Sequence, residues 1–121
     1  MFRILPAAFA ATLLVAQNDA FRRGVESQRR GDLAGARAAY EEALQANPKS
    51  VEALSNLGMV LLQTGQHQNA VRVFRDALAI RPGLAAVRYH LGLAQYRSGD
   101  FQGARKELTA VAKAEPQDGG T

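Results

Sequence analysis

The chain has 121 residues, of which 47% are hydrophobic and 7% aromatic, and it contains no cysteine or tryptophan. This length suits one small domain, and the lack of thiols excludes disulfides, thiolate zinc sites and cysteine nucleophiles. The net charge of +4, from 15 basic and 11 acidic residues, is a mild excess that gives little weight to an anionic partner. Abundant alanine with few aromatic residues favours closely packed helices over a sheet.

The first 16 residues are typical of a secretory signal peptide. One basic residue, Arg3, precedes an uncharged run from Ile4 to Ala16, which is too short to span a bilayer comfortably. We therefore expect residues 1–16 to be a signal peptide and the protein to be exported, to the periplasm or outside the cell. Two alternatives stay open: a buried apolar helix, or an uncleaved membrane anchor formed by residues 4–16, which is the one way in which we expect a membrane contact.

An internal repeat organises the rest of the chain. Four columns of identical residues recur every 34 residues: Gly24, Gly58 and Gly92; Gly31, Gly65 and Gly99; Ala36, Ala70 and Ala104; and Pro48, Pro82 and Pro116. The columns divide the chain into units 17–50, 51–84 and 85–118, with a tail at 119–121.

Each unit reads as two helices joined by a short turn. In the middle unit, apolar residues at helical spacing form two runs: Leu54, Leu57 and Leu61, then Ala70, Phe74, Ala77 and Leu78. Gly58 lies inside the first run, where a glycine costs about 1 kcal/mol relative to alanine. We expect a close helix contact with Ala70 to compensate. Gly65 lies in the turn, where a helix end commonly needs a residue with positive φ.

This 34-residue helix–turn–helix unit, with small residues at fixed places, a large aromatic and a terminal proline, resembles the tetratricopeptide repeat. The resemblance implies an all-α, right-handed superhelical solenoid of three hairpins. The middle unit matches best. The first departs at Arg23 and Ser27, as expected for an end unit that no earlier repeat covers.

The C-terminal edge also departs from the family, which places a polar capping helix after the last repeat. The five residues after Pro116 are too few for such a helix. We expect Leu108 and Val111 to be partly bare, so that this edge pairs with another chain, is tolerated as it stands, or belongs to a longer repeat array.

The resemblance also implies a concave groove lined by the first helix of each unit. The predicted groove residues are Phe21, Val25, Ser55, Asn56, Met59, Leu62, Tyr89, Leu93 and Tyr96, with Gln28 in the same columns. Most are apolar or aromatic although they are expected to face solvent, which favours a protein or peptide partner with apolar anchors. The alternative is that these side chains pack between neighbouring helices.

Other functions find little support in the sequence. In the family's two-carboxylate clamp only Asn56 fits, and that residue is common there for local hydrogen bonding. A basic cluster of Arg22, Arg23, Arg29 and Arg30 is accompanied by Asp19 and Glu26 at ion-pair spacing, which favours a solvated face over a nucleic-acid site.

We expect no enzyme activity, no cofactor or metal, no nucleic-acid partner and no small-molecule substrate, because His67 and His90 lie apart and no catalytic motif is present. The predicted function is a protein-interaction adaptor. The alternative is an assembly subunit that stacks through the C-terminal edge.

Overall fold

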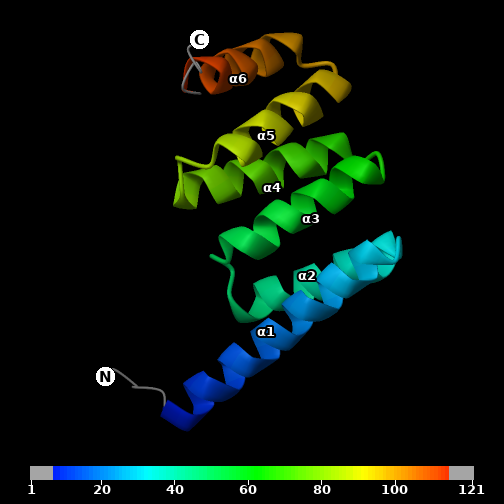
Figure 1. Cartoon of the computed structure of the whole chain (residues 1–121), viewed down its shortest axis with the longest axis vertical. Helices are drawn as coiled ribbons and strands as arrows, with labels where there is room; N and C mark the ends of the chain where they lie inside the picture. The colour runs from blue at the N-terminus through cyan, green and yellow to red at the C-terminus, as the bar shows by residue number, and fades with distance from the viewer. Residues whose placement is uncertain (1–6, 115–121) are drawn as a thin grey trace, which may run out of the picture.

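A computed structural model describes residues 7–114, which form six α-helices and no strand (Figure 1). The helices are α1 (Ala7–Arg29), α2 (Leu33–Ala46), α3 (Val51–Gln63), α4 (His67–Ile80), α5 (Ala85–Arg97) and α6 (Phe101–Ala114). The predicted all-α fold of three helical hairpins is confirmed. Pro116, the tail at 119–121 and the first six residues of the expected signal peptide lie outside the described residues.

The helices stack in chain order along one axis, from α1 at one end to α6 at the other (Figure 1). Each helix contacts the helices before and after it in the sequence, and α3 also touches α5. The stack therefore has an open end on each side, and its core is a continuous layer between consecutive helices.

The turn inside each hairpin uses the same glycine conformation. Gly31, Gly65 and Gly99 have φ values of 81°, 81° and 91°. After α3, the Gly65 N–H donates to the Leu62 carbonyl at 3.2 Å and the Gln66 N–H donates to the Leu61 carbonyl at 2.8 Å, the two bonds of a Schellman motif. The predicted role of Gly65 is confirmed.

Gly58 permits a close contact, but with a different residue from the one predicted. A Cβ atom at Gly58 would overlap the ring of Phe74, and a Cβ at Gly24 would likewise overlap the ring of Tyr40. The prediction of Ala70 as the facing residue is wrong because helical side chains lean toward the N-terminus of their helix. The Phe74 ring therefore reaches back over the turn that contains Ala70 and fills the notch.

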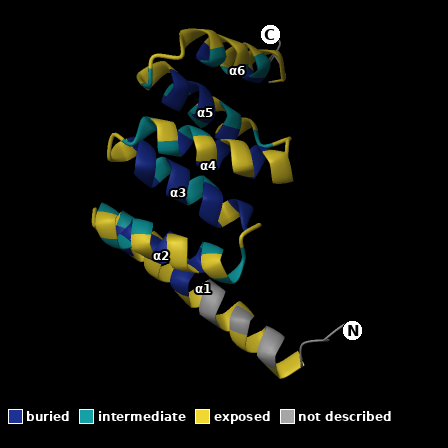
Figure 2. Cartoon of the chain, turned by 180° about the vertical axis from the view of Figure 1, so that it is seen from behind, coloured by how far each residue is buried: buried dark blue, intermediate teal, exposed yellow. Residues whose placement is uncertain are grey.

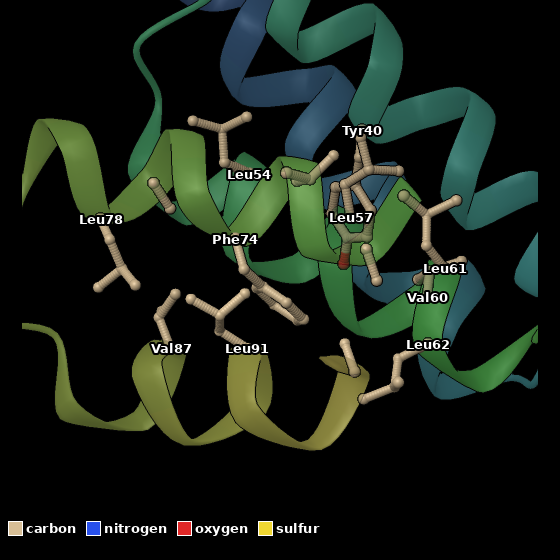
Figure 3. Close-up of a cluster of buried hydrophobic side chains, with 14 of the residues drawn as sticks. Tyr40, Leu54, Leu57, Val60, Leu61, Leu62, Phe74, Leu78, Val87 and Leu91 are labelled. Atoms are coloured by element: carbon tan, nitrogen blue, oxygen red, sulfur yellow. The ribbon is translucent and has the colours of Figure 1, made fainter. Parts of the chain in front are cut away.

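The hydrophobic core is centred on the middle hairpin (Figure 3). Tyr40, Val60, Phe74 and Leu91 are its largest fully buried side chains, and both predicted apolar runs of the middle unit are buried. At the C-terminal edge the prediction holds for Leu108 and is wrong for Val111. Val111 is buried because it lies on the side of α6 that faces the rest of the stack.

The first hairpin departs from the pattern at two residues, and the two behave differently. Arg23 is exposed, as expected for an end unit. Ser27 is buried, so the absence of an earlier repeat does not explain it. Instead, Ser27 and Gly35 and Ala39 of α2 line a small hollow between the two helices of this hairpin. Ser27 thus leaves unfilled a space that a larger side chain would occupy.

The first part of α1 extends past α2 as an exposed helix (Figure 2). Leu14 and Val15 are both more than half exposed, which contradicts a buried apolar helix for these two residues. Among the described residues, no helix combines the length and the apolar character that a membrane crossing requires. The signal peptide stays a prediction.

Candidate functional site

All nine predicted groove residues lie on the first helices of the hairpins: two on α1, four on α3 and three on α5. Of these, Val25, Tyr89 and Tyr96 are exposed, with 42%, 48% and 59% of their surface accessible. Phe21 and Val25 also line an open hollow on α1, together with Arg22. Exposed apolar side chains therefore occur on both α1 and α5.

Three other predicted groove residues are half-buried and support the core from the groove side. Phe21, Met59 and Leu93 pack against the main hydrophobic cluster. The ring of Phe21 lies 5.8 Å from the ring of Tyr40, centroid to centroid. For these three residues the alternative of packing between helices applies in part, and the surface that each still presents to solvent is small.

Leu62 is not a groove residue. It is only 3% exposed and belongs to the hydrophobic core, so the prediction that it faces solvent is wrong. Its column lies on the side of the first helix that faces the next hairpin, and α5 covers that side of α3. Tyr96 occupies the same column 34 residues later and is exposed. The column thus belongs to the junction between hairpins.

The polar members of the predicted set make local hydrogen bonds. Ser55 Oγ donates to the Val51 carbonyl at 2.7 Å. Asn56 Nδ2 donates to the Tyr40 hydroxyl at 3.3 Å, and that hydroxyl donates to Gln28 Oε1 at 2.7 Å. Burial raises the pKa of Tyr40, which keeps its phenol a neutral donor. Local hydrogen bonding by Asn56 is therefore confirmed.

Two aromatic contacts near the groove escaped the sequence analysis. The His90 ring stacks on Phe74 at 6.0 Å and meets the Tyr89 ring edge-on at 5.4 Å. Burial lowers the pKa of His90, so the neutral imidazole is favoured. Tyr96 meets Phe101 of α6 edge-on at 5.3 Å. Phe101 is a histidine, His67, in the preceding unit, so the repeat pattern gave no signal for it.

The arginines of α1 are largely paired with carboxylates. Arg22 contacts Asp19 at 3.0 Å and Arg29 contacts Glu26 at 2.8 Å, as the spacing predicted. The hydrogen bond from Arg29 also lowers the pKa of Glu26. In addition, Arg23 reaches Glu42 of α2 at 3.0 Å, a pair that helical spacing could not reveal. This face is a solvated set of ion pairs.

Within residues 7–114, no cluster of three or more histidine, cysteine, aspartate or glutamate side chains could hold a metal ion. His67 begins α4 and lines a polar hollow with Asn69 and Ser98, whereas His90 lies among aromatic rings on α5. The two histidines therefore belong to separate surroundings.

Comparisons with known proteins agree with the hairpin architecture. Two sequence models of the tetratricopeptide repeat match the chain, one over residues 21–85 and the other over residues 61–119. A TPR repeat-containing protein of Pseudomonas aeruginosa is 39% identical over 85 residues, which cover 70% of this chain and 34% of the relative. Cellulose synthase operon protein C of Komagataeibacter xylinus is 33% identical over 92 residues, covering 76% of this chain and 7% of the relative. The chain thus spans about a third or less of these relatives.

Solved structures show the same fold. The TPR domain of Arabidopsis OM64 superposes with a TM-score of 0.82 at 18% identity, covering 88% of each chain. The TPR2B domain of yeast Sti1, solved as a complex with pHsp70, gives a TM-score of 0.77 at 20% identity, covering 82% of this chain and 79% of that one. From the repeat columns, the hairpins and these matches together, the chain belongs to the tetratricopeptide repeat family.

Proposed function

We propose that this protein is an interaction adaptor that binds a partner polypeptide through the groove formed by α1, α3 and α5. One observation carries the proposal: Val25 and Tyr89 remain exposed on the first helices although the core beneath them is complete. Phe21 and Met59 extend the same surface as half-buried side chains. The Sti1 TPR2B domain, which shares the fold, is solved with a bound partner, and this supports a binding role.

The partner segment carries apolar anchors, because the accessible groove side chains are an isopropyl group and a phenol ring rather than charged groups. Half-buried Phe21 and Met59 provide shallow apolar seats beside them. The role needs neither catalysis nor a cofactor, since binding by apolar burial depends on surface complementarity alone.

Selection from a phage-displayed library of random peptides against the full chain tests this proposal. Peptides enriched in spaced apolar residues are expected, and Val25→Glu and Tyr89→Ala should each weaken their binding about tenfold. Ile80→Glu is the matched control for Val25→Glu. Ile80 is also β-branched and 42% exposed, but it lies at the end of α4, outside the groove. Equal binding by parent and groove variants would refute the proposal.

The second candidate function is assembly through the C-terminal edge. It is favoured by one observation: Leu108 is 36% exposed, whereas Phe74, its counterpart in the preceding hairpin, is fully buried. Assembly predicts that substitutions on α6 impair the protein's role while those in the groove leave it unchanged.

We also propose that residues 1–16 direct export. The uncharged run after Arg3 supports this reading, and exposed Leu14 and Val15 are consistent with an apolar segment outside the packed stack. Mass spectrometry of the protein isolated from its host checks the proposal. A mature chain lacking these residues is expected, and an intact first residue on a protein found in the cytoplasm would contradict it.

A further inference from the structure

An exposed patch closes the stack at its C-terminal end. Tyr96 is 59% exposed, Phe101 61% and Leu108 36%, and the rings of Tyr96 and Phe101 are in edge-on contact at 5.3 Å. Exposed Arg105 lies four residues after Phe101 and three before Leu108, so these three share one face of α6. We call these four residues the end patch. In Figure 1, α6 is the last element of the stack.

The counterparts of the end patch inside the stack are covered by a helix. Leu62 and Phe74 precede Tyr96 and Leu108 by one repeat and are buried beneath α5, with the His90 ring stacked on Phe74 at 6.0 Å. One hairpin earlier, Tyr40 is fully buried and accepts a hydrogen bond from Asn56 of α3. Both internal junctions therefore have the same cover, which indicates that the end patch is shaped to receive a helix.

The charges around the end patch select the kind of helix. α6 carries Arg105, Lys106 and Lys113 but a single carboxylate, that of Glu107. This carboxylate is already held by Arg88 of α5 at 2.8 Å. We propose that the end patch binds an amphipathic helix of a partner protein, with an apolar face that covers Tyr96, Phe101 and Leu108 and with acidic residues that meet Arg105. This inference rests on the second candidate function, assembly at the C-terminal edge, and names the partner.

A second copy of this chain fits the end patch less well. Two end patches placed face to face would bring the basic α6 helices together, which electrostatic repulsion disfavours. The exposed α1 of another copy offers Asp19 and Glu26, but both carboxylates already pair with arginines of their own helix. A separate acidic helix avoids both problems.

The test uses the full chain and two synthetic helical peptides. Both have leucine at helical spacing along one face. One carries glutamate at the flanking positions, and the other carries lysine at every one of those positions. Fluorescence anisotropy of each labelled peptide measures its affinity for the chain. The glutamate peptide should bind about tenfold more tightly than the lysine peptide, and less so as salt increases.

Matched variants locate the binding surface. Phe101→Ser and Arg105→Glu should each weaken the glutamate peptide about fivefold or more. Their controls are Ile80→Ser and Arg72→Glu, which alter exposed residues of α4 outside the end patch and should change affinity less than about twofold. Val25→Glu should also have no effect, which separates this site from the groove. Circular dichroism confirms that each variant keeps its helices.

Equal affinity for the two peptides, or unchanged binding by Phe101→Ser and Arg105→Glu, overturns the inference. Analytical ultracentrifugation distinguishes the remaining cases. A dimer that Phe101→Ser abolishes, with no peptide binding, preserves assembly at the C-terminal edge but makes a second copy the occupant. A monomer that binds neither peptide overturns both the inference and the second candidate function.

Discussion

The middle and last hairpins place the same columns of residues in opposite surroundings. Phe74 is fully buried and Leu62 is buried, whereas their counterparts Leu108 and Tyr96 are exposed. The backbone turn is the same in both hairpins, with Gly65 and Gly99 at φ values of 81° and 91°. The repeat therefore fixes the direction of each side chain, and the next helix in the stack decides whether that side chain is buried.

The two hairpins also differ in the contact that joins their own helices. In the last hairpin, Arg88 and Glu107 form a largely buried ion pair at 2.8 Å. One repeat earlier, Leu54 and Val73 occupy these columns, and both are buried in the core. An apolar contact and an ion pair thus serve the same position in the fold, which makes the exchange of one for the other a direct experiment.

Truncating the shared large column gives the largest expected effect. Phe74→Ala should reduce the free energy of unfolding by about 3–5 kcal/mol, because it leaves a cavity in the core. Leu108→Ala should cost about 1–2 kcal/mol, since that side chain is already partly in water. Urea denaturation measures both values. Equal losses would show that α5 does not set the difference between the hairpins.

Converting the ion pair to the apolar pair sharpens the comparison. Glu107→Val alone should destabilise the fold by about 2 kcal/mol, because it leaves the Arg88 guanidinium largely buried without its carboxylate. Adding Arg88→Leu should restore the free energy of unfolding to within about 1 kcal/mol of the parent. Urea denaturation of the single and double variants checks this. A double variant no more stable than Glu107→Val would contradict it.

Adding a methyl group at the glycine column should give effects of opposite sign. Gly58→Ala should destabilise by about 1–2 kcal/mol, because the buried Phe74 ring cannot move aside. Gly92→Ala meets the flexible end of Leu108 at 2.9 Å, which can shift into solvent. The better helix propensity of alanine should then stabilise this variant by about 0.5–1 kcal/mol. Thermal unfolding of the two variants separates these outcomes.

The smallest effect is expected from pH, through the residue that covers Phe74. Burial lowers the pKa of His90, so below the ordinary histidine value of 6.5 the unfolded chain binds more protons than the folded one. Stability should therefore fall as the pH drops from about 7.5 to about 5.5. Differential scanning fluorimetry should show a smaller fall in Tm for His90→Gln. An identical fall in parent and variant would assign the pH dependence to other groups.

The fold could be predicted because the repeat columns carry it redundantly. Three glycines in the turns, three inside the first helices and a regular proline each indicate the same hairpin, so no single residue had to be interpreted alone. The ion pairs of Arg22 and Arg29 were equally accessible, since helical spacing alone brings them to their carboxylates.

The candidate site was harder to predict because it depends on contacts between elements. Leu62 belongs to the core because α5 covers it, and Val111 is buried because of the face of α6 on which it lies. The choice of Phe74 over Ala70 as the contact of Gly58 depends on the direction of one ring. Spacing along the chain does not contain this information.

The stacking of each helix on its neighbours in sequence has a consequence for how the chain folds. When nearly all contacts are local, little chain entropy is lost in closing long loops, and such topologies fold rapidly. Folding can start in any hairpin and spread to the next. The middle hairpin, which holds most of the core, is the natural starting point, so the two ends of the stack should open first when the protein is stressed.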